Sequence, residues 1–199
     1  DESIWLVFNG EIYNFQTLRQ DLIQAGHVFR SNTDTEVIIH AYEEWGVDSI
    51  KRLRGMFAYA LWDIKRQRLV IARDRLGIKP LFYALRDGDL SFASELKAIR
   101  IDPDVRFELD ESAIYDFFTY RYIPTPKTIY RDVRKLPPAH YAVFEDGKFS
   151  LNCYWEPVFN NRSDIREADA IELLRHKLTE ATELHMIADV PVGVMLSGG

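Results

Sequence analysis

Four positions near the N-terminal end could stabilise an oxyanion and bind an amino acid. Asn9 and Gly10 follow a run of apolar residues. A side-chain amide beside a backbone N–H can stabilise the oxyanion that forms when a nucleophile attacks an amide carbonyl, and glycine allows close approach of a substrate. Glu11 and Asp34 add carboxylates that could bind an ammonium group. Taken singly, Asn-Gly is a common turn dipeptide and both acids are ordinary capping or solvated residues, so these alternatives remain open.

A second candidate site lies at the C-terminal end, in Leu196, Ser197, Gly198 and Gly199. The apolar segment 190–196 predicts a buried strand that leads into the two glycines. Backbone N–H groups in such a turn can converge on a phosphate, and the serine hydroxyl adds a donor. A simple glycine turn is the alternative.

Other reactive residue types favour structural roles. Cys153 is the single cysteine, so an internal disulfide is excluded and a reducing compartment is favoured. It lies in an aromatic-rich, strand-like stretch with no glycine turn or helix start to activate its thiol, which favours a packing residue over a nucleophile. The charged stretch 73–83 predicts a tight, ion-paired loop between strands. The histidines show no metal-ligand spacing, so no metal site is expected: His27, His40, His140, His176 and His185.

Apolar periodicity predicts the elements that position these residues. Residues 4–9 form a buried strand, and helices cover 15–25 and 34–45, the second capped by Thr33 with Glu36 in a capping box. Three strand pairs are predicted, namely 57–62 with 68–72, 81–85 with 90–93, and 139–144 with 148–154. Three further helices are predicted. Ser94 would cap a short helix that ends at Arg100, Asp110 would cap a helix over 111–119, and a long helix would cover 167–186.

Composition indicates a folded protein with one domain and part of another. Of its 199 residues, 47% are apolar and 28% are charged. The net charge of −6 gives no electrostatic reason to expect nucleic acid or a membrane surface as partner. No apolar run approaches the ~20 residues of a membrane span, and no leader is recognisable. A cytoplasmic location is expected. The polar stretch 156–164 predicts a domain boundary.

Together, these motifs resemble the glutamine-dependent asparagine synthetase family over nearly the whole chain. The similarity lies in the order of several segments rather than in any one of them. These are Phe8-Asn9-Gly10-Glu11-Ile12-Tyr13-Asn14, residues 31–36, 55–58, 73–83 and 93–95, the stretch 129–141, Tyr154-Trp155, and the final residues 189–199.

The resemblance implies a two-domain α+β chain. Residues 1–155 would be a class II glutamine amidotransferase domain, an incomplete four-layer αββα sandwich of the N-terminal-nucleophile hydrolase type. Residues 156–199 would supply the first helix and strand of an α/β ATP-pyrophosphatase-like synthetase domain. Asn9 and Gly10 match the family's oxyanion pair, Glu11 and Asp34 match positions that hold the glutamine α-amino group, and 196–199 match the start of the ATP site.

The resemblance also implies a chemistry. Ammonia released from glutamine would amidate aspartate that ATP has activated, with Mg²⁺ accompanying the nucleotide, although no residue here can be assigned to Mg²⁺. The family's nucleophile is an N-terminal cysteine, and no cysteine precedes Asn9. We therefore expect the chain as printed to be an inactive and poorly soluble fragment. A different acceptor, as in β-lactam-forming or tailoring enzymes, and a non-catalytic binding module both remain open, as does homodimer formation.

Overall fold

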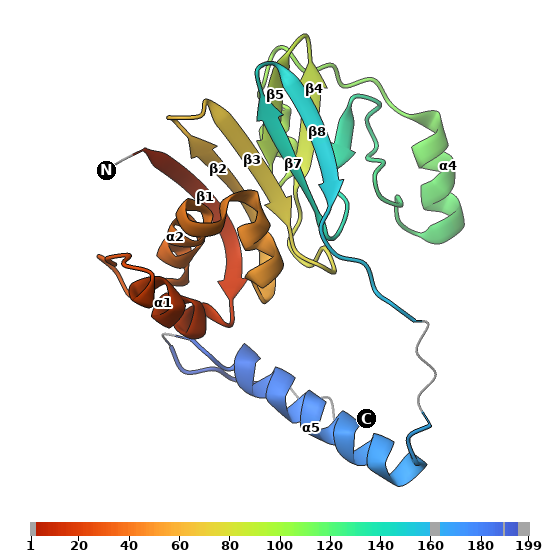
Figure 1. Cartoon of the computed structure of the whole chain (residues 1–199). Helices are drawn as coiled ribbons and strands as arrows, with labels where there is room; N and C mark the ends of the chain where they lie inside the picture. Colours follow the sequence, from red (N-terminus) through yellow and green to blue (C-terminus); the bar gives the residue numbers. More distant parts are fainter. Residues whose placement is uncertain (1–2, 160–163, 189, 195–199) are drawn as a thin grey trace. The chain divides into compact units, whose positions relative to one another are not determined.

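The computed structural model describes residues 3–159, 164–188 and 190–194. The chain divides into two compact units, Asp1–Glu156 and Pro157–Gly199. Each unit is described by itself (Figure 1). Among the described residues, no helix is long and apolar enough to cross a lipid bilayer.

The first unit is built on two antiparallel sheets. The larger sheet has the strand order β1-β2-β3-β7-β8 and the smaller has the order β5-β4-β6. The strands of the larger sheet are β1 (Ile4–Ile12), β2 (Gly55–Asp63), β3 (Arg68–Arg73), β7 (His140–Glu145) and β8 (Lys148–Cys153). Those of the smaller sheet are β4 (Phe82–Arg86), β5 (Asp89–Ala93) and β6 (Val133–Lys135). The three predicted hairpins are confirmed as β2–β3, β4–β5 and β7–β8.

Helices cover the outer faces of these sheets. Against the larger sheet lie α1 (Phe15–Gln24) and α2 (Asp34–Trp45), and α2 continues into the 3-10 helix η1 (Gly46–Arg52). On the smaller sheet lies the short α3 (Leu96–Ile99), and α4 (Glu111–Tyr120) follows. The side chain of Asp110 caps α4 as predicted, because its Oδ1 accepts the N–H groups of Ser112 and Ala113.

The alternation of side chains along β2 shows why two sheets stack. Phe57, Tyr59 and Leu61 belong to the core under α1 and α2, whereas Ala58 and Ala60 belong to the core between the two sheets. Successive strand residues point to opposite faces, so a strand that is buried on both faces must lie in an inner layer. The four-layer αββα arrangement is thereby confirmed.

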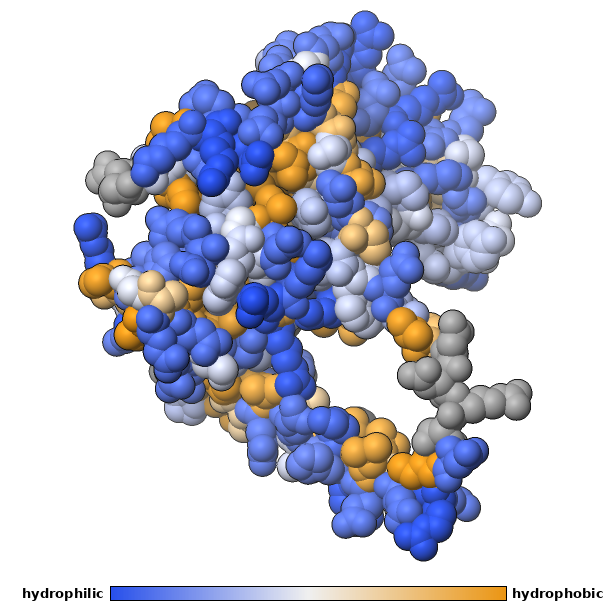
Figure 2. All heavy atoms as spheres, in the orientation of Figure 1, coloured by the Kyte–Doolittle hydropathy of each residue, from blue (hydrophilic) through white to orange (hydrophobic). Residues whose placement is uncertain are grey.

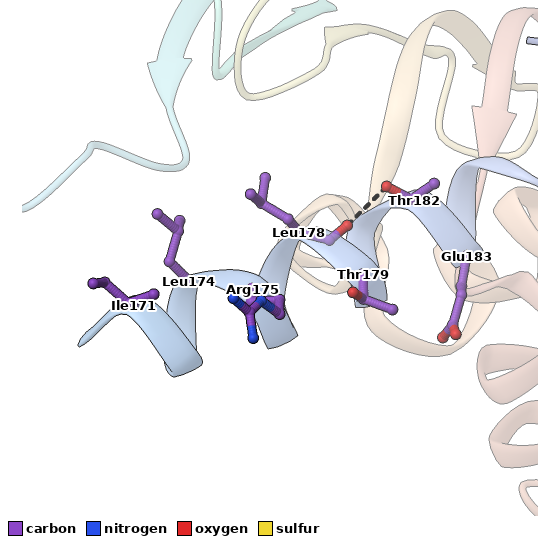
Figure 3. A pocket seen from close by; sticks show the side chains of 7 residues that line it. All are labelled: Ile171, Leu174, Arg175, Leu178, Thr179, Thr182 and Glu183. Atoms are coloured by element: carbon purple, nitrogen blue, oxygen red, sulfur yellow. Dashed lines mark hydrogen bonds between the residues drawn. The ribbon is translucent and has the colours of Figure 1, made fainter. Parts of the chain in front are cut away.

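The second unit consists mainly of α5 (Glu167–His185), close to the predicted helix. None of its described residues is buried, and Ile171, Leu174 and Leu178 are each more than half exposed. Hydrophobic spheres interrupt the hydrophilic surface along this helix (Figure 2). Figure 3 shows these three side chains beside a shallow groove of about 480 Å³. Soluble monomers rarely expose an apolar stripe such as the one that Ile171, Leu174 and Leu178 form on α5.

The predicted strand after α5 is wrong where it can be examined. Residues 190–194 form no strand, and the remainder of that segment lies outside the described residues. Strands need a hydrogen-bonded neighbour, and the segment pairs with no strand of the described residues. The candidate phosphate-binding residues Leu196, Ser197, Gly198 and Gly199 also lie outside the described residues.

Candidate functional site

Asn9 and Gly10 lie inside β1, not at its end. The strand continues to Ile12, with Asn9 opposite Ala58 and Gly10 opposite Phe57 on β2. The predicted end at Asn9 is therefore wrong, and so is the turn alternative for Asn-Gly. The strand continues past Asn9 because both β1 and β2 have a glycine where their backbones approach most closely. A Cβ at Gly10 would lie 2.1 Å from the carbonyl oxygen of Met56, and a Cβ at Gly55 would lie 2.1 Å from the carbonyl oxygen of Glu11. Two glycines thus allow the backbones to pair closely.

The pairing pattern directs the Gly10 N–H toward the open edge of the sheet. The N–H and C=O of Phe57 both bond to Asp74, at 3.1 Å and 2.8 Å, on the side away from β1. In an antiparallel pair, hydrogen-bonded and non-hydrogen-bonded residues alternate, so Gly10 occupies a non-hydrogen-bonded position opposite Phe57. Because β1 is the terminal strand of its sheet among the described residues, the Gly10 N–H points to that edge.

Asp34 lies beside the same edge. It is the first residue of α2, as predicted, and its Oδ2 accepts the backbone N–H of Ile12 at 2.9 Å. Residues two apart on a strand point their N–H groups the same way, so the carboxylate of Asp34 adjoins the edge where the Gly10 N–H is exposed. Glu11 is exposed and shares a strand face with Asn9. The structure therefore brings together all four residues that the sequence singled out at this end.

The Thr33 side chain helps to hold α2 in this position. Its Oγ1 accepts the Glu36 N–H at 3.4 Å, as a capping box requires. The Glu36 carboxylate accepts the N–H groups of Arg30 and Ser31, however, and not that of Thr33. The Glu36 side chain of the predicted capping box therefore bonds to residues that precede the N-cap, and it holds the loop before α2 in place.

Asn9 also faces a cavity between the two sheets. The cavity has a volume of about 240 Å³, and Asn9 and Ser94 provide polar atoms in an otherwise largely apolar lining. Asn9 Nδ2 donates to Ser94 Oγ at 3.3 Å. Other lining residues include Val7, Ala58, Ala60, Leu81 and Phe92.

Ser94 was missed as a partner of Asn9. It was predicted to cap the next helix, but α3 begins at Leu96, Glu95 occupies the N-cap position, and no side chain caps it. The stretch 93–95 was part of the resemblance, but no local pattern could pair residues 85 positions apart.

The loop after β3 is a scaffold held by backbone contacts rather than ion pairs. The guanidinium of Arg73 donates to the carbonyl oxygens of Gly77, Lys79 and Leu136, each at 2.7 Å. The buried carboxylate of Asp74 accepts N–H groups from four residues, namely Phe57, Leu76, Ile78 and Lys79. Burial lowers the pKa of Arg73, and neighbouring Asp74 opposes that shift. Backbone groups thus satisfy both the half-buried Arg73 and the buried Asp74, and no side-chain ion pair is found among the described residues 73–83, so the predicted ion pairing is wrong.

Cys153 lies far from this site. It ends β8, at the opposite edge of the larger sheet from β1, and its thiol contacts the Trp155 carbonyl oxygen. Four strand spacings separate the two edge strands, which is about 19 Å. Cys153 is therefore a strand residue, as expected, but its side chain is exposed, so the predicted packing role is wrong. At this distance it cannot attack a substrate held by Asn9.

Two stacked antiparallel sheets thus lie between helices, and an Asn-Gly pair lies on the edge strand β1 of the larger sheet. Residues 1–155 match the family model described as "Glutamine amidotransferase domain", and residues 173–199 match "Asparagine synthase". The chain belongs to the glutamine amidotransferase domain family, and its final residues match the asparagine synthase family.

Individual comparisons agree with this assignment. The chain is similar to "Asparagine synthetase [glutamine-hydrolyzing] 3" of Bacillus subtilis, with 37% identity over all of this chain and 32% of that protein. It is also similar to "Amidase chry2" of Gibberella zeae, with 36% identity over 99% of this chain and 29% of that protein. The chain spans about a third of the length of these relatives.

A solved structure shares the fold. This is a glutamine phosphoribosylpyrophosphate amidotransferase from B. subtilis, with a TM-score of 0.54 and 23% identity over 80% of this chain and 30% of that one. At this identity, the likeness shows the fold alone.

Proposed function

We propose that this chain is part of a glutamine-hydrolysing asparagine synthetase. Residues 1–155 would form its glutaminase domain, and residues 156–199 would begin its synthetase domain. The observation that carries the proposal is the meeting of Asn9, Gly10 and Asp34 at the open edge of β1. Amide and backbone donors lie beside a carboxylate there, as binding the two polar ends of glutamine requires.

The first polar end of glutamine is its side-chain amide. A carboxamide nitrogen has two N–H donors. Asn9 directs one at Ser94, and the other is then available to the oxyanion, together with the Gly10 N–H. Donors held in place before the reaction stabilise developing charge without reorganising. Ser94 acts as a positioning residue for the Asn9 amide.

The second polar end is the α-ammonium group. Asp34 uses Oδ2 to accept the Ile12 N–H, which fixes the orientation of the carboxylate. Oδ1 accepts the Thr35 hydroxyl at 3.4 Å and, with a second lone pair, can also accept from an ammonium. Glu11 supplies a second negative charge on the neighbouring strand position. Two carboxylates beside one cation give a favourable Coulomb interaction.

The nucleophile comes from outside residues 1–199 in this proposal, because Cys153 lies at the wrong edge of the sheet. The 199-residue chain alone would release no glutamate. In the longer protein, ammonia from glutamine would amidate aspartate activated by ATP, and Leu196, Ser197, Gly198 and Gly199 would bind the nucleotide phosphates, with Mg²⁺ entering as the ATP complex. We place the protein in the cytoplasm and leave homodimer formation to experiment.

A second candidate function differs in the acceptor. The chain is also 36% identical to a protein named as an amidase rather than an asparagine synthetase. The alternative that we propose is therefore a tailoring enzyme that amidates another carboxylic acid. Both candidates share the glutaminase site, so the acceptor alone distinguishes them.

The test measures glutamate release and asparagine formation by the longer protein with glutamine, aspartate and Mg²⁺–ATP. Asn9→Ala should lower kcat for glutamate release about 10²–10³-fold. Asn152→Ala, on the far edge strand β8, is the matched control and should leave it unchanged. Absence of glutamate release by the unaltered protein would refute the glutaminase assignment and favour a binding module. Glutamate release without asparagine formation would favour the second candidate.

A further inference from the structure

A cluster of two histidines and three glutamates lies on α2 and the segment that follows α1. His27 comes just after α1, and His40 and Glu43 are one helical turn apart on α2. One nitrogen of each histidine and one oxygen of Glu43 all lie within 4.8 Å of one another. The sequence showed no ligand spacing because the two histidines are 13 positions apart and a loop before α2 lies between them.

The ring nitrogens are arranged in two sets. Glu43 Oε2 lies 2.7 Å from Nδ1 of His40 and 3.5 Å from Nδ1 of His27, so both Nδ1 atoms face one carboxylate oxygen. Each Nε2 atom faces a different carboxylate, at 3.0 Å from Glu44 for His27 and at 3.4 Å from Glu36 for His40.

This arrangement matches a metal centre in two respects. Tetrahedral Zn²⁺ with bonds of about 2.0–2.2 Å places its ligand atoms roughly 3.3–3.5 Å apart. The two separations between Glu43 Oε2 and a histidine Nδ1, 2.7 Å and 3.5 Å, are close to that value. Metal-bound histidines almost always donate their other N–H to a carboxylate, which fixes the tautomer. Glu44 and Glu36 occupy that position for His27 and His40.

We propose that His27 Nδ1, His40 Nδ1 and a Glu43 carboxylate oxygen form a binding site for a divalent transition-metal ion, with Zn²⁺ the best match. Two imidazoles and one carboxylate suit Zn²⁺ rather than Ca²⁺ or Mg²⁺, which prefer oxygen ligands alone. The histidine side chains are each 16% exposed and that of Glu43 is 33% exposed, so the ion can enter from solvent and water can fill a fourth position.

Metal binding would join two segments that position the glutamine site. His27 follows α1, whereas His40 lies two turns along the helix that begins with Asp34. Phe29 packs edge-on against the His40 ring at 4.5 Å between ring centroids and shields one side of the cluster. A bound ion would therefore stabilise the α1–α2 pair.

The experiment uses the longer protein, freed of tags and stripped of metal with a chelator. Zn²⁺ binding is measured by calorimetry, and Co²⁺ binding by its visible absorption. We expect a Zn²⁺ site that His40→Gln or Glu43→Gln weakens at least tenfold, and that Glu44→Gln weakens about 10–100-fold. The midpoint of thermal unfolding should rise with Zn²⁺ and should rise less in these variants.

His176→Gln, a fully surface position on α5, and Cys153→Ser are matched controls and should bind Zn²⁺ as the unaltered protein does. If His40→Gln does not fold, Glu43→Gln decides the question, because that side chain is at the surface. Zn²⁺ binding that survives both variants, or that Cys153→Ser abolishes, would overturn the proposal. Failure of the glutaminase assay would leave these binding results unaffected.

Discussion

Replacing Gly10 with alanine tests the close pairing of β1 and β2 that exposes the candidate oxyanion donor. Two costs arise at this position. Its φ of +152° is a conformation that side chains rarely adopt, which costs of order 1–3 kcal/mol. The new Cβ would also lie 2.1 Å from the Met56 carbonyl oxygen and 2.7 Å from the Phe57 Cα, and such overpacking costs about 1–3 kcal/mol. The sum is roughly 2–6 kcal/mol, a large part of a domain's usual ~5–15 kcal/mol.

Two other glycines separate these contributions. Gly55→Ala introduces the clash with the Glu11 carbonyl oxygen at 2.1 Å without a positive φ, so it should cost about 1–3 kcal/mol. Gly147→Ala has a φ of +69° but open space around its Cβ, so it should cost only the ~1–2 kcal/mol of a left-handed residue. Gly10→Ala should therefore be the most destabilising of the three.

The assay is urea unfolding followed by tryptophan fluorescence. All four tryptophans of this chain lie in the first unit, so the signal from the chain reports on that unit: Trp5, Trp45, Trp62 and Trp155. The reasoning is refuted if Gly10→Ala costs no more than Gly147→Ala. It is also refuted if Gly55→Ala changes the free energy of unfolding by under ~0.5 kcal/mol, as an ordinary surface substitution does. If Gly10→Ala does not fold, Gly55→Ala still measures the close approach.

Three further predictions concern carboxylates that accept hydrogen bonds, namely the half-buried Asp34 and the buried Asp74 and Asp63. Asp34→Asn keeps an acceptor for the Ile12 N–H but loses its charge, so KM for glutamine should rise while stability holds; Asp34→Ala should also lose about 1–3 kcal/mol by urea unfolding. Asp74→Ala leaves four backbone N–H groups without their acceptor and should cost about 3 kcal/mol or more, and a smaller loss would contradict its scaffold role. Burial opposes ionisation of Asp63, but hydrogen bonds from Arg66 and Tyr42 outweigh it and lower its pKa below the ordinary 3.8. The stability that the Asp63 charge contributes is present above pH 3.8 and is lost as the pH falls further. The difference in the free energy of urea unfolding between the unaltered protein and Asp63→Asn should therefore shrink below pH 3.8.

Local sequence patterns were sufficient for most elements of the first unit. Hairpins such as β7–β8 join neighbouring strands through a short turn, so alternation and the turn residues Asp146-Gly147 predict them together. The start of α2 at Asp34 likewise depends on Thr33 and the residues that immediately follow. The motif order also placed Asn9, Gly10, Glu11 and Asp34 in one functional set.

Several features depended on contacts between distant residues. The end of β1 was misplaced because its last residues are held by β2, more than 40 positions away, through the paired glycines Gly10 and Gly55. The short strand β6 was missed because three residues carry too little periodicity to be recognised, and it exists by pairing with β4.

The sequence by itself determined which residue types were available for chemistry at the N-terminal site, because periodicity, caps and motif order are local properties of the chain. Only the tertiary structure decided that Ser94 orients Asn9, that Asp34 holds the Ile12 N–H beside Gly10, and that His27 meets His40. These contacts join segments that are distant in sequence. Their geometry follows from how sheets and helices pack around a shared core, which no local pattern encodes.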